Sequence, residues 1–346
     1  MDLLQRAPLP LGKTATTRST RNGLIVVAAV TAAVVVIRLA QATGVGQVQN
    51  FLLVFSSLLI EALPFILLGS VVSAAIEVFV PARFFARLGH LPKPLQMPLA
   101  GLGGFAFPVC ECGSVPVARR LASKGLTPQA AITFMLAAPV LNPIVLVATA
   151  VAYRGREAMW LMVGGRAVLA LIVALVAGWV LGGRSRGELL RNVEEDPHAD
   201  CAGEDCAHED SGEPKWKAFS THLAGDFLLL GKYLVIGGAA AAFLQTFVPQ
   251  SLIGTVATTP VLSIVALMAL AAALSLCSQS DAFVAASFVQ FGPAAQLGFL
   301  VFGPMFDAKL GFLYGGTFSK GFVRTLVAVI AAVTLAGTLW LEVAVG

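Results

Sequence analysis

Long apolar stretches recur along nearly the whole chain, from Gly23 to Val345, and they limit the fold more than any other feature. A helix needs roughly 20 mostly apolar residues to cross a hydrocarbon core about 30 Å thick. Only 12% of the 346 residues are charged, against about 25% in an ordinary soluble domain. The sequence therefore predicts an all-α integral membrane protein of the inner (plasma) membrane, with about seven to nine transmembrane helices facing the lipid bilayer.

The charged residues say more about topology than about a partner. The formal charge of +4 is small, and the basic residues gather at the ends of apolar stretches. This distribution is typical of topology determinants and excludes nucleic acid as a partner. Four basic residues within 1–22 precede an apolar run at 23–40, which favours a retained first helix over a cleaved signal peptide. Because no credible nucleotide motif is present, transport would use an ion gradient, the substrate's own gradient or a partner.

The chain contains an internal repeat that appears when it is compared with itself. A shift of 165 residues places Cys112 on Cys277 and Asn142 on Asp307. Cysteine occurs only five times in the chain, so such matches are hard to obtain by chance. We expect a cytoplasmic tail with an extra transmembrane helix, a first repeat, a cytoplasmic acidic linker and a second repeat. Their bounds are 1–50, 51–183, 184–222 and 223–346.

Two apolar segments, 97–121 and 259–290, are interrupted by proline, glycine or polar residues. Broken backbone at membrane depth is tolerated only inside protein or against a water-filled cavity. If both segments re-enter as hairpins, most Lys and Arg residues fall on the cytoplasmic side and the second repeat is inverted relative to the first. Inverted repeats with interrupted helices are typical of secondary transporters, whose site lies near the bilayer midplane. If both segments cross fully, the repeats are parallel instead.

Cysteines supply the sharpest chemical signal. Cys110-Glu111-Cys112 lies within the first interrupted segment, and the repeat relates it to Cys277. Thiolates are soft ligands that select soft metals and metalloids. Residues two apart on a regular helix point about 200° from each other, so only a helix break lets both thiols face one cavity. Glycine and proline nearby supply such a break. A purely structural role stays open, because free cysteine is often a small buried apolar residue.

Ionisable and polar residues accompany the cysteines within apolar sequence. Such groups are costly in a membrane and usually face the bundle interior or water, although they could instead neutralise one another and serve packing. Arg166 lies well inside a span and needs a partner. Further helix interruptions are expected at 139–143 and 304–307. The candidate substrate-binding residues are Cys110, Cys112, Cys277, Glu111, Asp281, Asn142, Asp307, Lys309 and Glu61.

The linker offers a separate group of metal ligands. His198, Cys201, Cys206 and His208 lie within eleven residues and could hold one tetrahedral zinc or a Cu(I) ion. Their spacing matches no standard zinc finger, and the neighbouring acidic residues suit a plain disordered linker equally well. Metal capture and a simple linker therefore both stay open.

Four stretches bring these features together: FPVCECGSVPVARRL at 107–121, APVLNP at 138–143, LCSQSDAFVA at 276–285 and GPMFDAKLG at 303–311. They resemble the signature of the predicted-permease family that contains the ArsP-type organoarsenical efflux permeases and related proposed copper/zinc exporters. The resemblance covers the chain from about residue 51 to residue 344. It implies a multi-span permease and, for some members, export of trivalent organoarsenicals through membrane cysteines. The linker is more similar to the metal-exporter branch.

The chain is accordingly predicted to be an efflux permease and not an enzyme. Its expected cargo is a soft, thiol-seeking substrate, either a trivalent organoarsenical or a soft metal ion such as copper or zinc, carried by Cys110, Cys112 and Cys277. No cofactor is expected apart from transported or linker-bound zinc or copper. Two other hypotheses stay open: a membrane thiol oxidoreductase with Cys277 as the resolving thiol, and a metal-sensing membrane protein whose linker is the active part.

Overall fold

The computed structural model describes residues 46–80, 93–105, 109–123, 126–183, 215–247 and 260–345. The expected span at 23–41 and the linker ligands His198, Cys201, Cys206 and His208 lie outside these ranges. The chain divides into two units after Leu53. Of the first unit only Gly46–Leu53 is described, as the beginning of a helix, and the contacts given below lie within the second unit.

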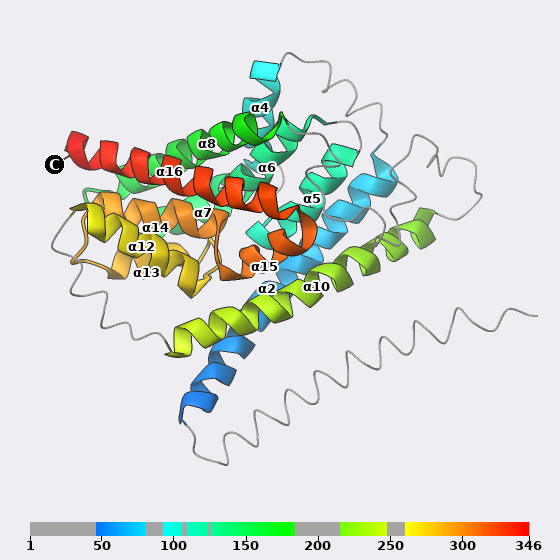
Figure 1. Cartoon of the computed structure of the whole chain (residues 1–346), viewed down its shortest axis with the longest axis horizontal. Helices are drawn as coiled ribbons and strands as arrows, with labels where there is room; N and C mark the ends of the chain where they lie inside the picture. The colour runs from blue at the N-terminus through cyan, green and yellow to red at the C-terminus, as the bar shows by residue number, and fades with distance from the viewer. Residues whose placement is uncertain are drawn as a thin grey trace, which may run out of the picture. The chain divides into compact units, whose positions relative to one another are not determined.

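Helices joined by short turns make up the described residues, so the protein is an all-α membrane protein as expected (Figure 1). The helices before the linker are α2 (Gly46–Phe79), α4 (Lys93–Leu102), the 3-10 helix η1 (Gly103–Phe105), α5 (Glu111–Ser123), α6 (Pro128–Leu141), α7 (Pro143–Ala152) and α8 (Met159–Leu181). Those after it are α10 (Lys215–Phe247), α12 (Pro260–Leu274), α13 (Asp281–Ser287), α14 (Pro293–Met305), α15 (Ala308–Thr317) and α16 (Lys320–Val345).

Both halves follow one order of elements: a long helix, two interrupted segments and a second long helix. Six spans among the described residues are long and apolar enough to cross a membrane, which makes this a multi-pass membrane protein. They are Gly46–Phe79, Pro128–Ala152, Met159–Leu181, Trp216–Thr246, Pro293–Thr317 and Lys320–Ala344. Helix α10 begins at Lys215, eight residues before the expected second repeat starts at 223.

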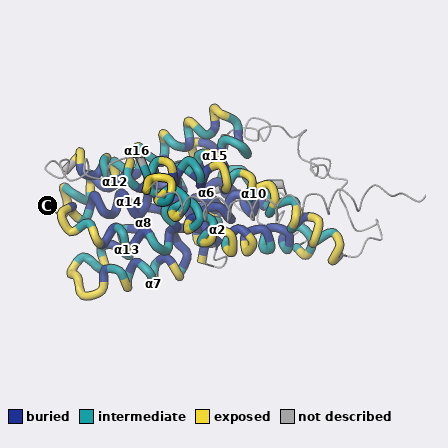
Figure 2. The backbone as a smooth tube through the Cα atoms, turned by 90° about the horizontal axis from the view of Figure 1, so that it is seen from below, coloured by how far each residue is buried: buried dark blue, intermediate teal, exposed yellow. Residues whose placement is uncertain are grey.

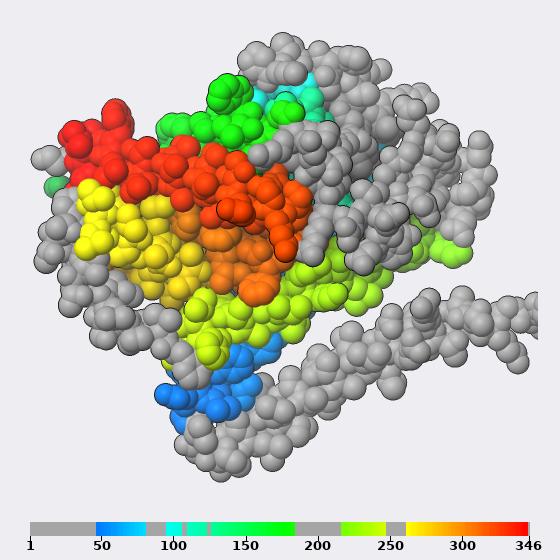
Figure 3. Space-filling model, in the orientation of Figure 1, coloured from blue at the N-terminus to red at the C-terminus, as the bar shows by residue number. Residues whose placement is uncertain are grey.

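Burial separates the spans into inner and outer ones (Figure 2). In Pro128–Ala152 and Pro293–Thr317, 78% of the most apolar window is buried inside the protein, against 17% in Gly46–Phe79 and 22% in Lys320–Ala344. The outer helices expose large apolar side chains such as Ile60 and Trp340, which suits a surface against lipid. Helices α16, α12 and α10 cover much of the face seen in Figure 3.

Both inner spans are interrupted at the predicted places, and each break has a side-chain cap. Helix α6 ends at Leu141, and the Asn142 side chain accepts a hydrogen bond of 3.0 Å from the Ile144 amide at the start of α7. In the second half, Asp307 accepts one of 2.7 Å from the Leu310 amide at the start of α15. These caps satisfy amides that lack a partner at a helix start. The interruptions are therefore stable local structures.

The two first helices of the halves, α2 and α10, run in opposite directions. Phe55 lies beside Gly238, and further along α2 the Ser73 hydroxyl donates a 2.7 Å hydrogen bond to Asp226, which lies earlier on α10. The last helices, α8 and α16, contact each other and also run in opposite directions (Figure 1). Equivalent long helices are thus antiparallel in both cases.

Candidate functional site

The Cys-Glu-Cys sequence forms the start of helix α5. The Cys110 carbonyl accepts the first helical bond, from the Ser114 amide at 3.0 Å, and its sulfur accepts a 3.4 Å bond from the Gly113 amide. Cys110 therefore caps the helix, and Cys112 is the second residue of the helix. Glu111 is the first helical residue, where a negative charge is favourable to the helix dipole. All three residues are buried.

Cys277 lies in the break between α12 and α13. Ser275, just after α12, has a positive φ of 49°, a conformation that is uncommon for residues other than glycine. Its hydroxyl accepts a 3.2 Å hydrogen bond from the Ala308 amide, which ties the break to the start of α15. The Cys277 carbonyl then accepts bonds from the Ser280 and Asp281 amides, both at 3.0 Å. The break is thus a defined turn that holds the cysteine inside the protein.

One hydrogen bond joins the two cysteine-bearing segments. Ser278, the residue after Cys277, donates through its hydroxyl to Glu111 Oε2 at 3.3 Å. Glu111 lies between Cys110 and Cys112. The fold therefore brings segments 167 residues apart in sequence into direct contact. The three buried thiols are not joined by a disulfide.

A buried charge cluster adjoins this contact. The Lys309 ammonium lies 3.5 Å from Asp307 Oδ2 and 3.7 Å from Glu111 Oε1, and each of the three residues is at most 3% exposed. Both carboxylate oxygens lack a hydrogen-bond partner among the described residues. Separations of this size leave the ammonium only loosely bonded, so the cluster is electrically paired but incompletely hydrogen-bonded. With both carboxylates ionised, its formal charge is one negative.

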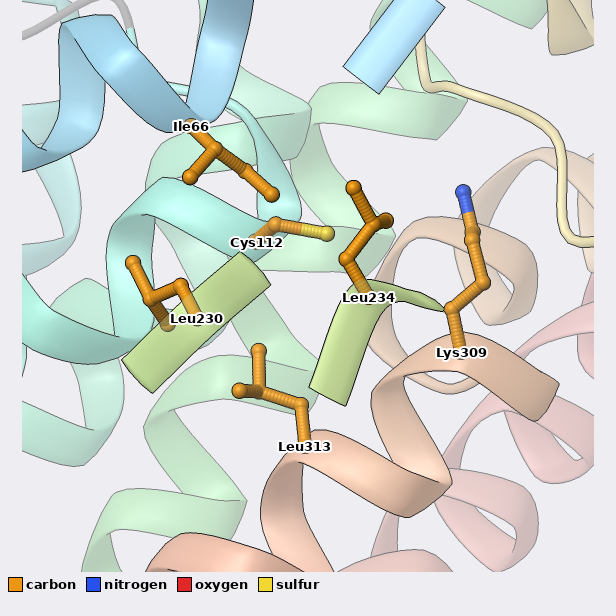
Figure 4. A pocket seen from close by; sticks show the side chains of 6 residues that line it. All are labelled: Ile66, Cys112, Leu230, Leu234, Lys309 and Leu313. Carbon is orange, nitrogen blue, oxygen red and sulfur yellow. The ribbon is translucent and has the colours of Figure 1, made fainter. Parts of the chain in front are cut away.

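A small cavity lies where the halves meet, with about 10 Å³ of space, close to the minimum for one water molecule. Figure 4 shows Cys112 and Lys309 in its wall, together with four aliphatic side chains. They come from α2, α5, α10 and α15, and they are Ile66, Cys112, Leu230, Leu234, Lys309 and Leu313. Cys112 gives this otherwise largely apolar wall a soft ligand, and Lys309 connects the wall to the buried charge cluster.

Arg166 finds its partner in the other half. Its guanidinium donates to both oxygens of Asp281, at 3.0 and 2.7 Å, and also to the Ser278 carbonyl at 3.0 Å and the Thr149 hydroxyl at 2.9 Å. Fork-to-fork pairs of this kind are the strongest charge-assisted hydrogen bonds. Asp281 is therefore paired with Arg166 and holds the Cys277 turn against α8.

The remaining candidates divide into those near the cysteines and those apart from them. Glu61 accepts a 3.0 Å hydrogen bond from the Ser280 hydroxyl, three residues after Cys277. Asn142 caps α7, and the described contacts of its side chain are local. The four linker ligands lie outside the described residues, so the metal site there stays a prediction.

Sequence reasoning missed two groups of residues. Ser278 and Ser280 connect the halves, and the polar run Ser-Gln-Ser after Cys277 was the available signal. Arg120, one of the basic residues at the ends of apolar stretches, pairs with Glu77 at 3.5 Å and with Asp226 at 3.4 Å. These partners lie on α2 and α10, so Arg120 also ties α5 to the long helices of both halves.

This combination of six apolar spans among the described residues, paired interruptions within the inner spans and buried polar residues at the interruptions is typical of a multi-pass permease. The chain belongs to the family described as "Predicted permease" (ArsP_1), whose profile matches residues 47–342.

Two relatives extend this result. "UPF0718 protein YcgR" of Bacillus subtilis (strain 168) is 39% identical over 287 residues, which cover 83% of this chain and 95% of the relative. The "Putative two-component membrane permease complex subunit" of Streptococcus mutans serotype c (strain ATCC 700610 / UA159) is 34% identical over 285 residues, 82% of this chain and 91% of the relative. No solved structure matches the chain. The protein is therefore a transporter rather than an enzyme, which overturns the thiol oxidoreductase hypothesis.

Proposed function

We propose that this permease exports a soft, thiol-seeking substrate through a site shared by Cys110, Cys112 and Cys277. The observation that carries the proposal is the contact between Ser278 and Glu111, because it joins the turn of Cys277 to the Cys-Glu-Cys sequence. Thiols from both halves can exchange a bound ligand with one another as the halves move. Alternating access in transporters of this architecture places the site at such an interface.

The charge of the site favours a neutral metalloid over Cu(I). A trivalent organoarsenical, R-As(OH)2, condenses with two thiols to form two As–S bonds and two water molecules, so the net charge does not change. A Cu(I) ion bound by two thiolates releases two protons and leaves a complex with one added negative charge. The cluster of Glu111, Asp307 and Lys309 is already formally negative by one charge, and further negative charge is costly in a buried site.

Inverted repeats fit this proposal. The equivalent helices α2 and α10 run antiparallel, as the contacts at Phe55 and Ser73 indicate. Parallel repeats would make equivalent helices run in the same direction. We therefore favour the topology in which the interrupted segments 97–121 and 259–290 do not cross fully, and in which the second half is inverted.

Uptake into inside-out membrane vesicles tests the substrate. The panel is methylarsonous acid, phenylarsine oxide, Cu(I) and Zn(II), and we expect uptake of the two arsenicals. Changing Cys110, Cys112 or Cys277 to Ser should each abolish most of this uptake, because a hydroxyl is a hard and largely protonated ligand where a thiol deprotonates on binding. Uptake of Zn(II) or Cu(I) without the arsenicals would contradict the metalloid assignment.

Thiol protection tests whether the site is shared. In a background that carries Cys201→Ser and Cys206→Ser, only the three membrane thiols remain to report on alkylation. Phenylarsine oxide forms two As–S bonds, so at saturation it should protect two thiols at a time in the purified protein, and Cys277 should be among those protected. Continued alkylation of Cys277 while Cys110 and Cys112 are protected would show that Cys277 is not part of the site.

A further inference from the structure

Glu61 is an acidic residue near the centre of the 34-residue outer helix α2. Its side chain is only partly buried, on a helix of which most of the apolar window faces outward. A fixed charge at this depth of a bilayer is costly, and acidic residues found there commonly bind or relay ions. Glu61 therefore needs an explanation that packing does not supply.

The described contacts of Glu61 contain no neutralising cation. Its one described polar contact is the 3.0 Å hydrogen bond from the Ser280 hydroxyl. No nitrogen of a described Lys, Arg or His lies within ion-pair distance of its carboxylate. This separates Glu61 from the other acidic residues near the cysteines, which are held by Lys309 or Arg166.

The charged groups of the neighbouring elements are engaged elsewhere. On α15, Lys309 is paired with Glu111 of α5 and with Asp307. At the start of α13, Asp281 is paired with Arg166. On α10, Asp226 is paired with Arg120, and the Lys232 ammonium lies over the Tyr233 ring. The other titratable groups on these elements include the thiols Cys110, Cys112 and Cys277, the phenols Tyr233 and Tyr314, and the basic side chains Arg119, Lys217 and His222. None of these groups has a described ion pair with Glu61. A proton is thus the simplest neutralising partner for Glu61.

Ser280 connects the protonation state of Glu61 to the turn that holds Cys277. Its hydroxyl lies 3.0 Å from Glu61 Oε1 and 3.1 Å from the Cys277 carbonyl oxygen, but it carries a single hydrogen. When Glu61 is ionised, the hydroxyl donates to the carboxylate. When Glu61 is protonated, the carboxyl donates to Ser280 Oγ and the serine hydrogen turns to the Cys277 carbonyl. The protonation state of Glu61 thereby changes the bonding of the turn that holds Cys277.

We infer that Glu61 is the proton-binding site that couples transport to the proton gradient, an inference that rests on the proposed export function. One proton enters from the outer side, neutralises Glu61 and leaves to the cytoplasm, while one substrate molecule moves outward. The exchange needs no oxidant or reductant, and the proton that binds is the proton that leaves. Contact between α2 of the first half and the Cys277 turn of the second half links this proton to the motion of the halves.

Purified full-length protein in proteoliposomes tests the coupling with methylarsonous acid as the probe. Counterflow at equal pH on both sides reports movement of the substrate alone. Accumulation driven by a pH difference reports coupling, and a pH-sensitive dye inside the vesicles reports the accompanying protons. The wild type should show all three. Glu61→Gln, which resembles the protonated side chain, should keep counterflow and lose gradient-driven accumulation to the level seen at equal pH. Glu342→Gln on α16 is the matched control and should behave as wild type.

The outcomes separate the two proposals. No counterflow by the wild type would refute the proposed function and this inference with it. Counterflow by the wild type with neither accumulation driven by a pH difference nor accompanying proton movement would refute only the coupling, and this result does not depend on how a variant folds. Retained gradient-driven accumulation in Glu61→Gln would likewise show that the proton binds elsewhere.

Discussion

Arg166 carries a positive charge at a position where its side chain has no exposure to solvent. The bidentate pair with Asp281 and the bonds to Ser278 and Thr149 satisfy four of its donor interactions. A buried charge is tolerated only when it is paired and hydrogen-bonded in this way. At the scale of single residues, the site is therefore built from charges that one half supplies and the other neutralises.

Replacing Arg166 by Gln should strongly destabilise the protein, because Asp281 would remain as an uncompensated buried charge. Loss of one partner of a buried pair typically costs about 3 to 5 kcal/mol. Thermal unfolding of the detergent-solubilised protein measures this loss. Arg154→Gln, at an exposed position in the loop after α7, should change stability by less than about 0.5 kcal/mol. Equal stability of the two variants would show that the Arg166 pair is not the anchor described above.

The sequence indicated that Arg166 needs a partner, and it singled out Asp281 as a candidate substrate-binding residue. It did not connect the two, because they lie 115 residues apart and belong to different halves. The roles of Ser278 and Ser280 could not be predicted for a related reason. A serine is uninformative until the fold shows which acceptor its hydroxyl faces, here Glu111 and Glu61.

At the scale of elements, two long helices meet short functional helices through glycine. A Cβ atom at Gly69 of α2 would lie 2.6 Å from the Gly113 Cα atom of α5, and one at Gly237 of α10 would lie 2.9 Å from the Lys309 Cα atom of α15. These two glycines lie 168 residues apart, close to the 165-residue shift of the internal repeat. Close approach of the helices at both glycines sets the positions of Cys112 and Lys309.

Gly69→Ala should therefore separate α2 from α5, because backbone atoms cannot move aside as a flexible side chain can. Overpacking of a well-packed contact costs about 1 to 3 kcal/mol, and we expect a loss of thermal stability of this size with reduced uptake. Gly231→Ala is the control, since nothing lies within 4 Å of a Cβ atom there. A fully active and stable Gly69→Ala protein would contradict the close contact.

The positions of these elements could largely be predicted from the sequence. Hydropathy gave the spans, and proline with polar residues marked the breaks near 142 and 307. The beginning of α10 at Lys215 could not be predicted, since its first turns, Lys-Trp-Lys-Ala-Phe-Ser-Thr-His, carry polar residues and resemble a linker. His222 and Asp226 in the early part of this helix contact Arg120 of α5.

At the scale of the whole molecule, the equivalent helices α2 and α10 run antiparallel, and we therefore propose that the second half crosses the membrane in the opposite sense. The repeat matches predicted the correspondence between the halves. The packing between them could not be predicted, because it depends on which buried faces meet and not on the order of spans.

The inverted arrangement predicts opposite sides for two reporter positions. A fusion at Gly212, in the linker, should report the cytoplasm, and a fusion at Gly346 should report the periplasm, because an odd number of crossings separates them. A pair of reporters, one active only in the cytoplasm and the other only in the periplasm, would measure the side of each position directly. The same side for both positions would contradict the inverted arrangement, and full-length protein by immunoblot is the control for each fusion.

The contrast between inner and outer spans also bears on how the chain enters the membrane. The span Pro293–Thr317 has a mean hydropathy of 1.3, against 2.4 for Gly46–Phe79, and it is the one mostly enclosed by protein. A segment with prolines and buried charges gains little by moving alone from the translocon into lipid. Its insertion during synthesis must therefore wait for the neighbours that will surround it. The buried polar residues of the candidate site are thus the ones that make the protein's biogenesis cooperative.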